Sequence, residues 1–393
     1  MLDPSTFRDA VVGFVRHRST NKAGEYTMCS DGHVTLYSSC FAAMTLHYLN
    51  AVHDLAGKER LAWAAYIKQW QDPESGRFIG PEIVAGELTS TKHDWDHLTK
   101  HLTAHALPAL HLLGELPPYP LRFAHPFLDP ETLLRWLNQR DWRQAWLEGN
   151  NLLFAGQFLI YLRDFEGRDE AQSALETLFD WLDAHQDPAT GLWGTNGYCD
   201  SYPAMYGGYH QLLLYYYCKR PLPFAERLID LTLALQHSDG SFTRQGGGGA
   251  CEDADGVDIL VNHYKRTGFR QRAVCTSLAR VVDHILKQHM EDGGFVYRRG
   301  VPFSHMGIKR TYVPANTSDM FSTWFRVHTI ALACQVLHHH PLAEISWRFN
   351  DTCSMGWHHQ SPLPTPQGNP LPDFLPFSWR RLSARVLRAV KTS

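Results

Sequence analysis

The sequence predicts an all-α fold of six helical hairpins closed in a ring. The first observation behind this prediction is a turn that recurs along the chain. It reads Gln, a few polar residues, Gly, one further residue and an aromatic residue, and copies begin at Gln71, Gln186, Gln236 and Gln288. The last three copies begin 50 and 52 residues apart (186 to 236, 236 to 288), and the gap from 71 to 186 is about two such periods. A period near 50 with self-similar units indicates an array of one supersecondary block.

The second observation is the alternating character of the segments between the turns. Amphipathic helical segments precede the turns at 61–70, 174–185, 225–235 and 278–287, and a degenerate unit at 133–146 fits the missing place. The other segments begin polar and then become apolar nearly all round, as buried helices do. They start near Asp31, Asp94, Glu148, Asp200, Glu252 and Asp319.

Pairing each amphipathic helix with a buried one gives an outer and an inner helix in every unit. Six such pairs closed in a ring form an (α/α)6 toroid, and closure removes the exposed ends that an open solenoid must cap. We assign residues 1–350 to this single domain and 351–393 to a C-terminal extension with a basic amphipathic tail.

In such a ring the inner helices run the same way, so their polar starts meet at one mouth. Helix N-termini also favour an anion there. The predicted substrate-binding residues of this cup are Trp95, Asp96, His97, Asn150, Asn151, Tyr202, Tyr206, His210, Trp324, Arg326 and His328.

Four carboxylates fall within seven residues at the start of the fifth inner segment: Glu252, Asp253, Asp255 and Asp258. Capping a helix needs one or two carboxylates, not four. Like charges this close raise one another's pKa, and a carboxyl that stays protonated near neutral pH can act as a general acid. These four residues are therefore the candidate catalytic group.

Histidines recur every four residues at 93, 97, 101 and 105, which places them on one face of a helix. Pairs with this spacing can chelate a metal. No carboxylate stands at the spacing of an H-E-x-x-H motif, so we favour packing over metal binding. No metal site and no cofactor are expected, with Zn²⁺ or Mg²⁺ as the open alternative.

The composition is that of a soluble globular protein, with 44% apolar and 20% charged residues and a formal net charge of −3. No nucleic-acid partner is expected without a basic face. No transmembrane run or signal peptide is recognised, and eight scattered cysteines indicate reduced thiols and a cytoplasmic location. The basic, partly apolar tail at 374–393 suits either docking on the ring or a peripheral contact with an anionic membrane.

The recurring turns resemble the QW motifs of the terpenoid-cyclase and protein-prenyltransferase toroids, and Gln186…Gly191-Leu192-Trp193 is the cleanest match. Class II terpene cyclases protonate an alkene or epoxide with the middle Asp of an Asp-x-Asp-Asp motif. The matching place here reads Asp253-Ala254-Asp255-Gly256, with Gly at the fourth position. The resemblance implies acid-initiated cyclisation or isomerisation of a polyprenyl-type substrate, an isomerase or lyase activity, with Asp255 as the proton donor and Asp253 in support.

Three alternatives remain at this point. Prenyltransferase β subunits hold zinc with Asp-x-Cys and a later His; here the order is reversed in Cys251-Glu252-Asp253, with His328 as the third ligand. Sugar-active (α/α)6 enzymes (uronyl hydrolases, lyases and epimerases) share the ring, and they would use Asp96, His97, Asp253 and His210 for acid-base chemistry on a sugar. The third alternative is a non-catalytic binding scaffold.

Overall fold

The computed structural model describes residues 3–84, 87–88 and 93–359. The outer helices are α1 (Pro4–His17), α3 (Gly57–Lys68), α5 (Pro130–Leu137), α7 (Glu170–His185), α9 (Ala225–Leu235) and α11 (Gln271–Leu286). The inner helices are α2 (Leu36–Tyr48), α4 (Trp95–Leu112), α6 (Ala145–Asp164), α8 (Ser201–Tyr217), α10 (Ala250–Thr267) and α12 (Met320–Cys334). The short 3-10 helices are η1 (Val52–Asp54), η2 (Arg122–Leu128), η3 (Trp142–Gln144), η4 (His305–Gly307), η5 (Lys309–Thr311) and η6 (Pro341–Glu344).

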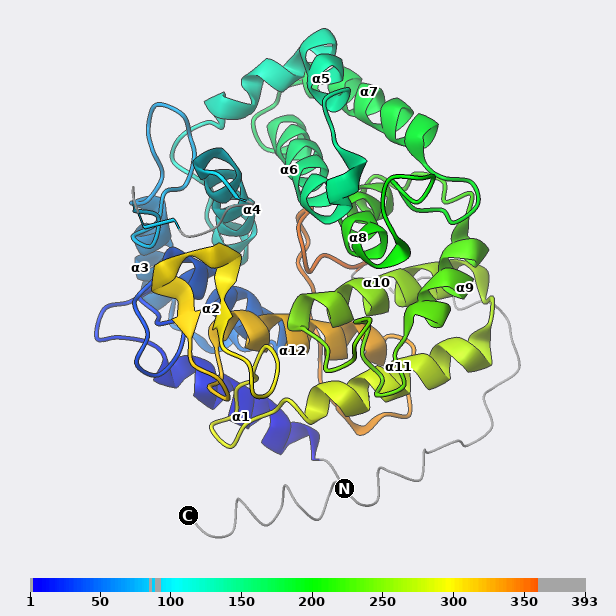
Figure 1. Cartoon of the computed structure of the whole chain (residues 1–393). Helices are drawn as coiled ribbons and strands as arrows, with labels where there is room; N and C mark the ends of the chain where they lie inside the picture. The colour runs from blue at the N-terminus through cyan, green and yellow to red at the C-terminus, as the bar shows by residue number, and fades with distance from the viewer. Residues whose placement is uncertain (1–2, 85–86, 89–92, 360–393) are drawn as a thin grey trace.

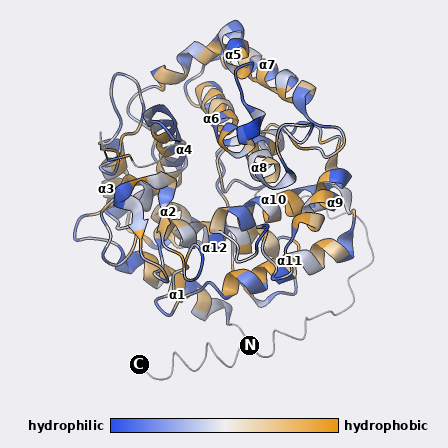
Figure 2. Ribbon diagram, in the orientation of Figure 1, coloured by the Kyte–Doolittle hydropathy of each residue, from blue (hydrophilic) through white to orange (hydrophobic). Residues whose placement is uncertain are grey.

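The inner helices contact one another in chain order: α2 with α4, α4 with α6, α6 with α8, α8 with α10, α10 with α12, and α12 with α2. Figure 1 shows them around a common centre, with the outer helices at the periphery. The peripheral helices carry both hydrophilic and hydrophobic residues (Figure 2), as helices with one buried face do. The predicted mostly helical α/α fold is confirmed. In the part of the chain that the structure describes, the only sheet is the antiparallel pair β1 (Phe303–Ser304) and β2 (Tyr312–Val313).

Local chemistry explains where several inner helices begin. Asp94, Asp200 and Asp319 are the N-cap residues of α4, α8 and α12, and each side chain accepts a backbone N–H of the first turn. Such capping satisfies N–H groups that have no partner inside the helix. The N-cap of α10 is Gly249, which has no side chain to do this. The carboxylates at 252–258 therefore do not share the capping role of the other acidic helix starts.

The recurring turns have a common internal brace. The side-chain Nε2 of the Gln donates to the carbonyl of the turn Gly, from Gln71 to Gly76 (2.9 Å), from Gln186 to Gly191 (2.8 Å) and from Gln236 to Gly240 (2.8 Å). These glycines have φ of +82°, +80° and +98°, a region that favours glycine.

Two of these Gln side chains also reach the following hairpin. Gln71 donates to the Tyr119 carbonyl (2.8 Å), and Gln236 donates to the Ser277 carbonyl (2.9 Å). The turn thus sets its own geometry and ties neighbouring units together.

Two irregular segments cover the helix ends. Residues 303–313 lie over the N-terminal ends of α2, α4 and α12, where the His305 ring is 4.6 Å from Tyr37 and 4.4 Å from Phe321. Arg310 holds this segment to the loop after α3, by donating to Glu87 (3.0 Å) and to the Pro81 carbonyl (2.9 Å).

At the other end of the inner helices, residues 345–359 pack near the centre of the helices, in orange in Figure 1. Tyr48 Oη donates to the Gly356 carbonyl (3.2 Å), and residues 353–358 are all buried. Packing therefore continues past residue 350, while the predicted tail at 374–393 lies outside the described residues. None of the described helices is both long and apolar enough to cross a membrane.

Candidate active site on α10

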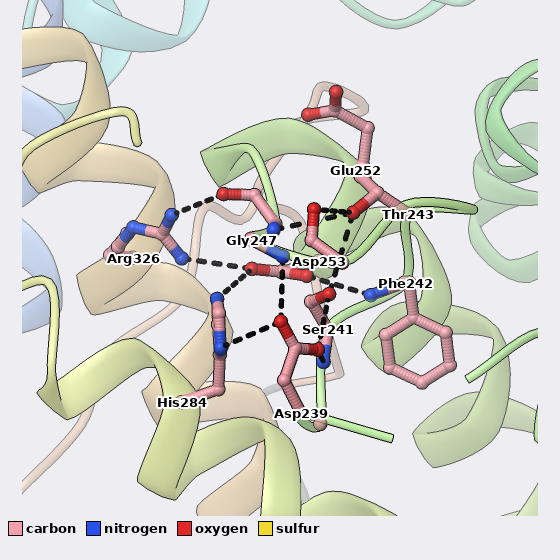
Figure 3. Close-up of polar contacts among 12 residues, drawn as sticks. Asp239, Ser241, Phe242, Thr243, Gly247, Glu252, Asp253, His284 and Arg326 are labelled. Atoms are coloured by element: carbon pink, nitrogen blue, oxygen red, sulfur yellow. Dashed lines mark hydrogen bonds and ion pairs between the residues drawn. The ribbon is translucent and has the colours of Figure 1, made fainter. Parts of the chain in front are cut away.

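Asp253, in the first turn of α10, is fully buried and fully hydrogen-bonded. Its Oδ1 accepts from the Phe242 N–H (2.9 Å), and its Oδ2 accepts from Arg326 Nη1 (2.9 Å), as Figure 3 shows. Arg326, on α12, is also fully buried and donates to the carbonyls of Val296, Gly248 and Tyr297. The pair therefore joins α10, α12, the 236–249 loop and the strand-like stretch at 296–297. Arg326 was predicted to bind substrate and Asp253 to support the catalytic acid, and in the structure protein groups occupy the polar atoms of both side chains.

His284 and Asp239 extend this group of contacts (Figure 3). His284 Nε2 is 3.8 Å from Asp253 Oδ2, and its Nδ1 is 3.9 Å from Asp239 Oδ2. Burial raises the pKa of Asp239, but hydrogen bonds from Gly247 and Ser241 outweigh burial and hold that pKa below its ordinary value. The glycine run at 246–249 is thus bound to the site at several points.

Asp255 and Asp258 are also buried, but they lack the hydrogen bonds and the ion pair that Asp253 has. Asp255 is 1% exposed, and its Oδ2 has no hydrogen-bond partner among the described residues; the same holds for both carboxylate oxygens of Asp258. Burial, followed by the charges of Glu252, Asp258 and Asp253, raises the pKa of Asp255 well above its ordinary value. Burial raises the pKa of Asp258 to about 8, against opposing effects of Asn262 and Arg266. A pKa of about 8 leaves Asp258 mostly neutral at pH 7, and the raised pKa of Asp255 favours its neutral form as well. A neutral carboxyl can donate a proton.

Glu252, the fourth carboxylate, accepts hydrogen bonds from Tyr297 Oη (2.8 Å) and from Cys251 Sγ (3.1 Å). Burial and then Glu252 and Asp255 raise the pKa of Cys251 well above its usual range, which favours the thiol over the thiolate in the metal-free protein. Within the described residues, no three His, Cys, Asp or Glu side chains gather as metal ligands would. The structure does not bring Cys251, Asp253 and His328 into such a group, since His328 instead stacks on Tyr48 at 5.4 Å.

Side-chain packing explains why a glycine, Gly256, stands at the fourth position of the acidic motif. A Cβ built on Gly256 would lie 2.5 Å from Cγ of the Phe242 ring. Phe242 is the aromatic residue of the recurring turn that begins at Gln236, and its N–H is bound by Asp253. An Asp at 256 therefore requires Phe242 to move, so the turn and the helix start are matched to each other.

Helix α8 faces the two neutral acids. Burial and then the charges of Asp258 and Asp255 raise the pKa of Tyr209 well above its ordinary value, against an opposing hydrogen bond from the Gly356 backbone. The predicted residues Tyr206 and His210 are engaged within the protein, since Tyr206 Oη donates to the Phe242 carbonyl (2.9 Å) and His210 Nδ1 to the Tyr206 carbonyl (2.7 Å). From the sequence, Tyr209 was considered only as an aromatic face for a carbocation or a sugar ring, and not as a neighbour of the acidic residues.

Tyr202, the other predicted residue of α8, lies at the first turn of the helix. Its hydroxyl donates to the Leu235 carbonyl (3.1 Å), and the Arg244 guanidinium lies 4.8 Å from its ring centroid. Tyr202 thus contacts the end of α9 and the 236–249 loop.

The residues predicted on α4 and α6 divide into two groups. His97 Nδ1 donates to Asn151 Oδ1 (3.0 Å) and Asn151 donates to Glu148 (3.0 Å), which forms a polar chain between the two helices. Asn150 Nδ2 donates to the carbonyl of Trp146 on its own helix (3.1 Å).

Asp96 instead pairs with Arg77 (2.7 Å) and Lys100 (2.6 Å), and its side chain is 53% exposed. Trp95 is 39% exposed. The structure therefore places His97 and Asn151 inside, and Asp96 and Trp95 at the surface.

Aromatic and imidazole rings from α2, α4 and α12 form a buried wall. Phe41 stacks on Trp324 at 4.9 Å, and His105 lies 5.3 Å from each of them. Tyr37 Oη and His101 Nδ1 are hydrogen-bonded at 2.9 Å. Burial, and then neighbouring histidines, lower the pKa of His101 well below its ordinary value, so the wall is uncharged at neutral pH. Aromatic faces of this kind attract a cation.

Glu82 was missed from sequence. It is fully buried before α4, and its carboxylate accepts the N–H groups of Leu36 and Tyr37 at the start of α2 (2.9 and 3.0 Å). Burial raises the pKa of Glu82 to about 7 despite these hydrogen bonds. Nothing in the local sequence distinguishes this Glu from a surface residue.

The chain resembles solved structures of enzymes in its fold. A type II terpene cyclase from Scytonema, in complex with its substrate geranylgeranyl dihydroxybenzoate, aligns with a TM-score of 0.50 and 14% identity, covering 85% of this chain and 98% of that one. A GH76 α-mannanase from Bacteroides thetaiotaomicron aligns with a TM-score of 0.50 and 13% identity, covering 86% and 98%. No protein-family model matches the sequence, and no curated protein matches it. At these identities the likeness concerns the fold alone, a mostly helical α/α arrangement.

Proposed function

We propose that the protein is an (α/α)6 toroid enzyme that starts the cyclisation or isomerisation of a polyprenyl-type substrate by protonating it. The order of contacts among the inner helices, with α12 against α2, supports a closed ring. The fold likeness to a terpene cyclase supports this reaction class, and the likeness to a mannanase keeps a sugar substrate as the alternative.

The observation that carries the proposal is the state of Asp255. Its carboxyl is buried, its Oδ2 has no partner among the described residues, and burial with neighbouring carboxylates raises its pKa well above the ordinary value. Such a group holds its proton at neutral pH and has it available for a substrate atom. Asp253 differs because Arg326 and the Phe242 N–H already occupy its oxygens.

In the proposed reaction, the Asp255 O–H bond breaks and its proton adds to one carbon of a terminal C=C bond. The π electrons form the new C–H bond and leave a carbocation at the other carbon. A second C=C of the substrate attacks this carbon, which closes a ring and moves the positive charge to another carbon. The Asp255 carboxylate then takes a proton from the neighbouring C–H bond, whose electrons form a new C=C bond, and the acid is restored. The aromatic wall of Phe41 and Trp324 offers π faces to the positive charge, while the Asp253–Arg326 pair fixes the start of α10. We propose no resident cofactor for these steps.

The carbohydrate alternative is favoured by the polar chain His97–Asn151–Glu148 beside the centre. Hydroxyl groups of a sugar would suit such side chains. Acid-base hydrolysis of a glycoside needs two carboxyl groups in different protonation states. Asp253 is unsuited to the ionised role because its oxygens are occupied, which is why we place this function second.

The test is turnover of geranylgeranyl diphosphate and related prenyl substrates, with products identified by mass spectrometry, for the wild type and Asp255→Asn. Loss of a general acid lowers the rate roughly 10²- to 10⁴-fold. Asp230→Asn is the matched control, since Asp230 lies on α9 and pairs with Arg270 on the outside. Full turnover by Asp255→Asn removes Asp255 as the acid. Turnover of uronic acids or mannosides alone replaces the proposal with the carbohydrate alternative.

A further inference from the structure

The C-terminal end of α10 carries a group of basic side chains that the proposed reaction does not use. This basic cluster comprises Lys265 and Arg266 in the last turn of α10, and His358 and His359 in the C-terminal segment. Arg266 Nη2 donates to His359 Nε2 (3.2 Å), and the rings of His358 and His359 are 6.1 Å apart. Two segments far apart in the sequence thus bring basic groups together, and the exposed Lys219 after α8 adds a positive charge that acts on His359.

The Arg266 guanidinium contacts neutral groups, since Nη1 donates to the Asn262 carbonyl (2.7 Å) and its carbon lies 4.8 Å from the Tyr216 ring centroid. Across residues 3–84, 87–88 and 93–359, no ion pair involves Lys219, Lys265 or Arg266. Lys265 is only 7% exposed. Burying a cation without a counter-ion is costly, so such an arrangement calls for an anion. Asp258 acts on Arg266, but with a pKa of about 8 it is mostly neutral at pH 7 and supplies little negative charge.

His358 is the second, independent observation. Its side chain is fully buried, and neither ring nitrogen has a hydrogen-bond partner among the described residues. Buried polar groups are almost always hydrogen-bonded, to protein, water or ligand. Burial and then Lys265 lower the pKa of His358 well below its ordinary value, so it presents one N–H and one acceptor. The N–H suits an oxygen of an anion held by Lys265 and Arg266.

The helix dipole gives a simpler account of part of this cluster. Lysine and arginine in a last turn interact favourably with the negative end of a helix. That account fits two residues on α10, but exposed side chains would serve equally well. It does not explain the burial of Lys265, the unpartnered His358, or the approach of His359 from another segment.

We propose that the basic cluster is a binding site for a phosphate-type anion, at the end of α10 opposite the acidic residues. Asp255 and Arg266 are 11 residues apart on one helix (255 to 266), which is about 17 Å along its axis. An anion held there cannot contact Asp255, so the site binds rather than reacts. The source is either a free phosphate or the head group of a phosphorylated lipid. Assigning the head group of a prenyl diphosphate rests on the proposed function, whereas the anion site does not.

The test is binding of inorganic pyrophosphate to the full chain at neutral pH and low salt, by calorimetry and by phosphorus NMR. We expect saturable binding by the wild type and binding weakened roughly tenfold or more in Lys265→Met and in Arg266→Met, because charge-assisted hydrogen bonds are lost. Lys58→Met, an exposed lysine of α3, is the matched control and should bind as the wild type does. Competition by geranylgeranyl diphosphate assigns the site to a lipid head group, and lack of competition assigns it to free phosphate.

Absence of pyrophosphate binding, or equal binding by all variants, overturns the proposal. If Lys265→Met does not fold, the melting temperature of the wild type decides, since a ligand of the folded state must raise it. Asp255→Asn separates the two proposals. It should keep pyrophosphate binding and lose turnover, so failure of the acid and failure of the anion site give different results.

Discussion

Two faces of α10 carry buried carboxylates that differ in whether their oxygens have hydrogen-bond partners. On the face toward α12 and the 236–249 loop, Asp253 has both oxygens hydrogen-bonded and an arginine beside it. On the face toward α8, Asp255 Oδ2 and both oxygens of Asp258 have no hydrogen-bond partner among the described residues. All three are essentially inaccessible to solvent. Burial alone therefore does not identify the reactive group. The reactive carboxyl is instead the buried one that lacks hydrogen-bond and ion-pair partners.

The helix geometry explains how neighbours in sequence reach such different surroundings. Two residues along an α-helix differ by about 200° around its axis, so Asp253 and Asp255 point to nearly opposite sides. For a buried carboxylate, hydrogen bonds and an adjacent cation offset part of the cost of leaving water. An uncompensated one costs stability and keeps its proton, which is the property a proton donor needs.

The largest expected effect on the free energy of unfolding comes from the face of α10 that carries the Asp253–Arg326 pair. Arg326→Met leaves Asp253 buried without a cation, and breaking one partner of a buried ion pair costs about 3–5 kcal/mol. Urea unfolding should show this loss in the free energy of unfolding. The double variant Arg326→Met with Asp253→Asn should recover part of it, since no charge is then left unpaired. A loss below about 1 kcal/mol in the single variant would contradict the role assigned to the pair.

The next largest effect is a pH dependence of the folding stability, which comes from Asp258 on the face of α10 whose carboxylates lack partners. An unfolded Asp has a pKa near 3.8, whereas Asp258 has a pKa of about 8 in the folded protein. Between these values the folded state binds one proton more, so stability falls as pH rises, by about 1.4 kcal/mol per pH unit. The difference in unfolding free energy between the wild type and Asp258→Asn should therefore grow in favour of the variant, by about 3 kcal/mol from about pH 5 to about pH 7. A constant difference over this range would show that Asp258 is ionised.

A smaller effect tests the contact that joins the two faces. Gly256→Ala places a methyl group against the Phe242 ring, and overpacking of this kind costs about 1–3 kcal/mol. Gly13→Ala is the matched control, because Gly13 also lies in a helix but has no atom within 4 Å of an added Cβ. The control should gain about 0.5–1 kcal/mol from helix propensity. If both variants gain stability in thermal unfolding, Phe242 yields easily and the match between turn and helix is not required.

The smallest effect extends the comparison to the recurring turns. Gln186 is buried and its Nε2 donates to Gly191, whereas Gln288 is equally buried but its Oε1 has no partner among the described residues. Gln186→Leu should cost about 1 kcal/mol, and Gln288→Leu should cost less or stabilise the protein. Equal losses for the two variants would show that the hydrogen bond to the turn Gly is not what stabilises it.

Much of the fold could be predicted because its signals are local. The turn glycines mark positive φ angles, and the acidic N-caps at 94, 200 and 319 mark helix starts within one residue. The burial of Asp255 followed from its place on an inner helix. The same reasoning placed Asp96 in the centre, but this residue is bound at the surface by Arg77 and Lys100. Position along a helix does not give the facing neighbour, and the neighbour decides whether a polar group is free.

The sequence by itself thus determined the helical units, their alternation of amphipathic and buried helices, and the gathering of carboxylates at the start of α10. These follow from periodicity and turn chemistry, which act over a few residues. Only the tertiary structure decided that Arg326 neutralises Asp253 from 73 residues away, that Tyr209 faces the two neutral acids, and that the C-terminal segment completes a basic cluster. These features depend on which helix faces come into contact, and that is set by the packing of all the helices together rather than by any one segment.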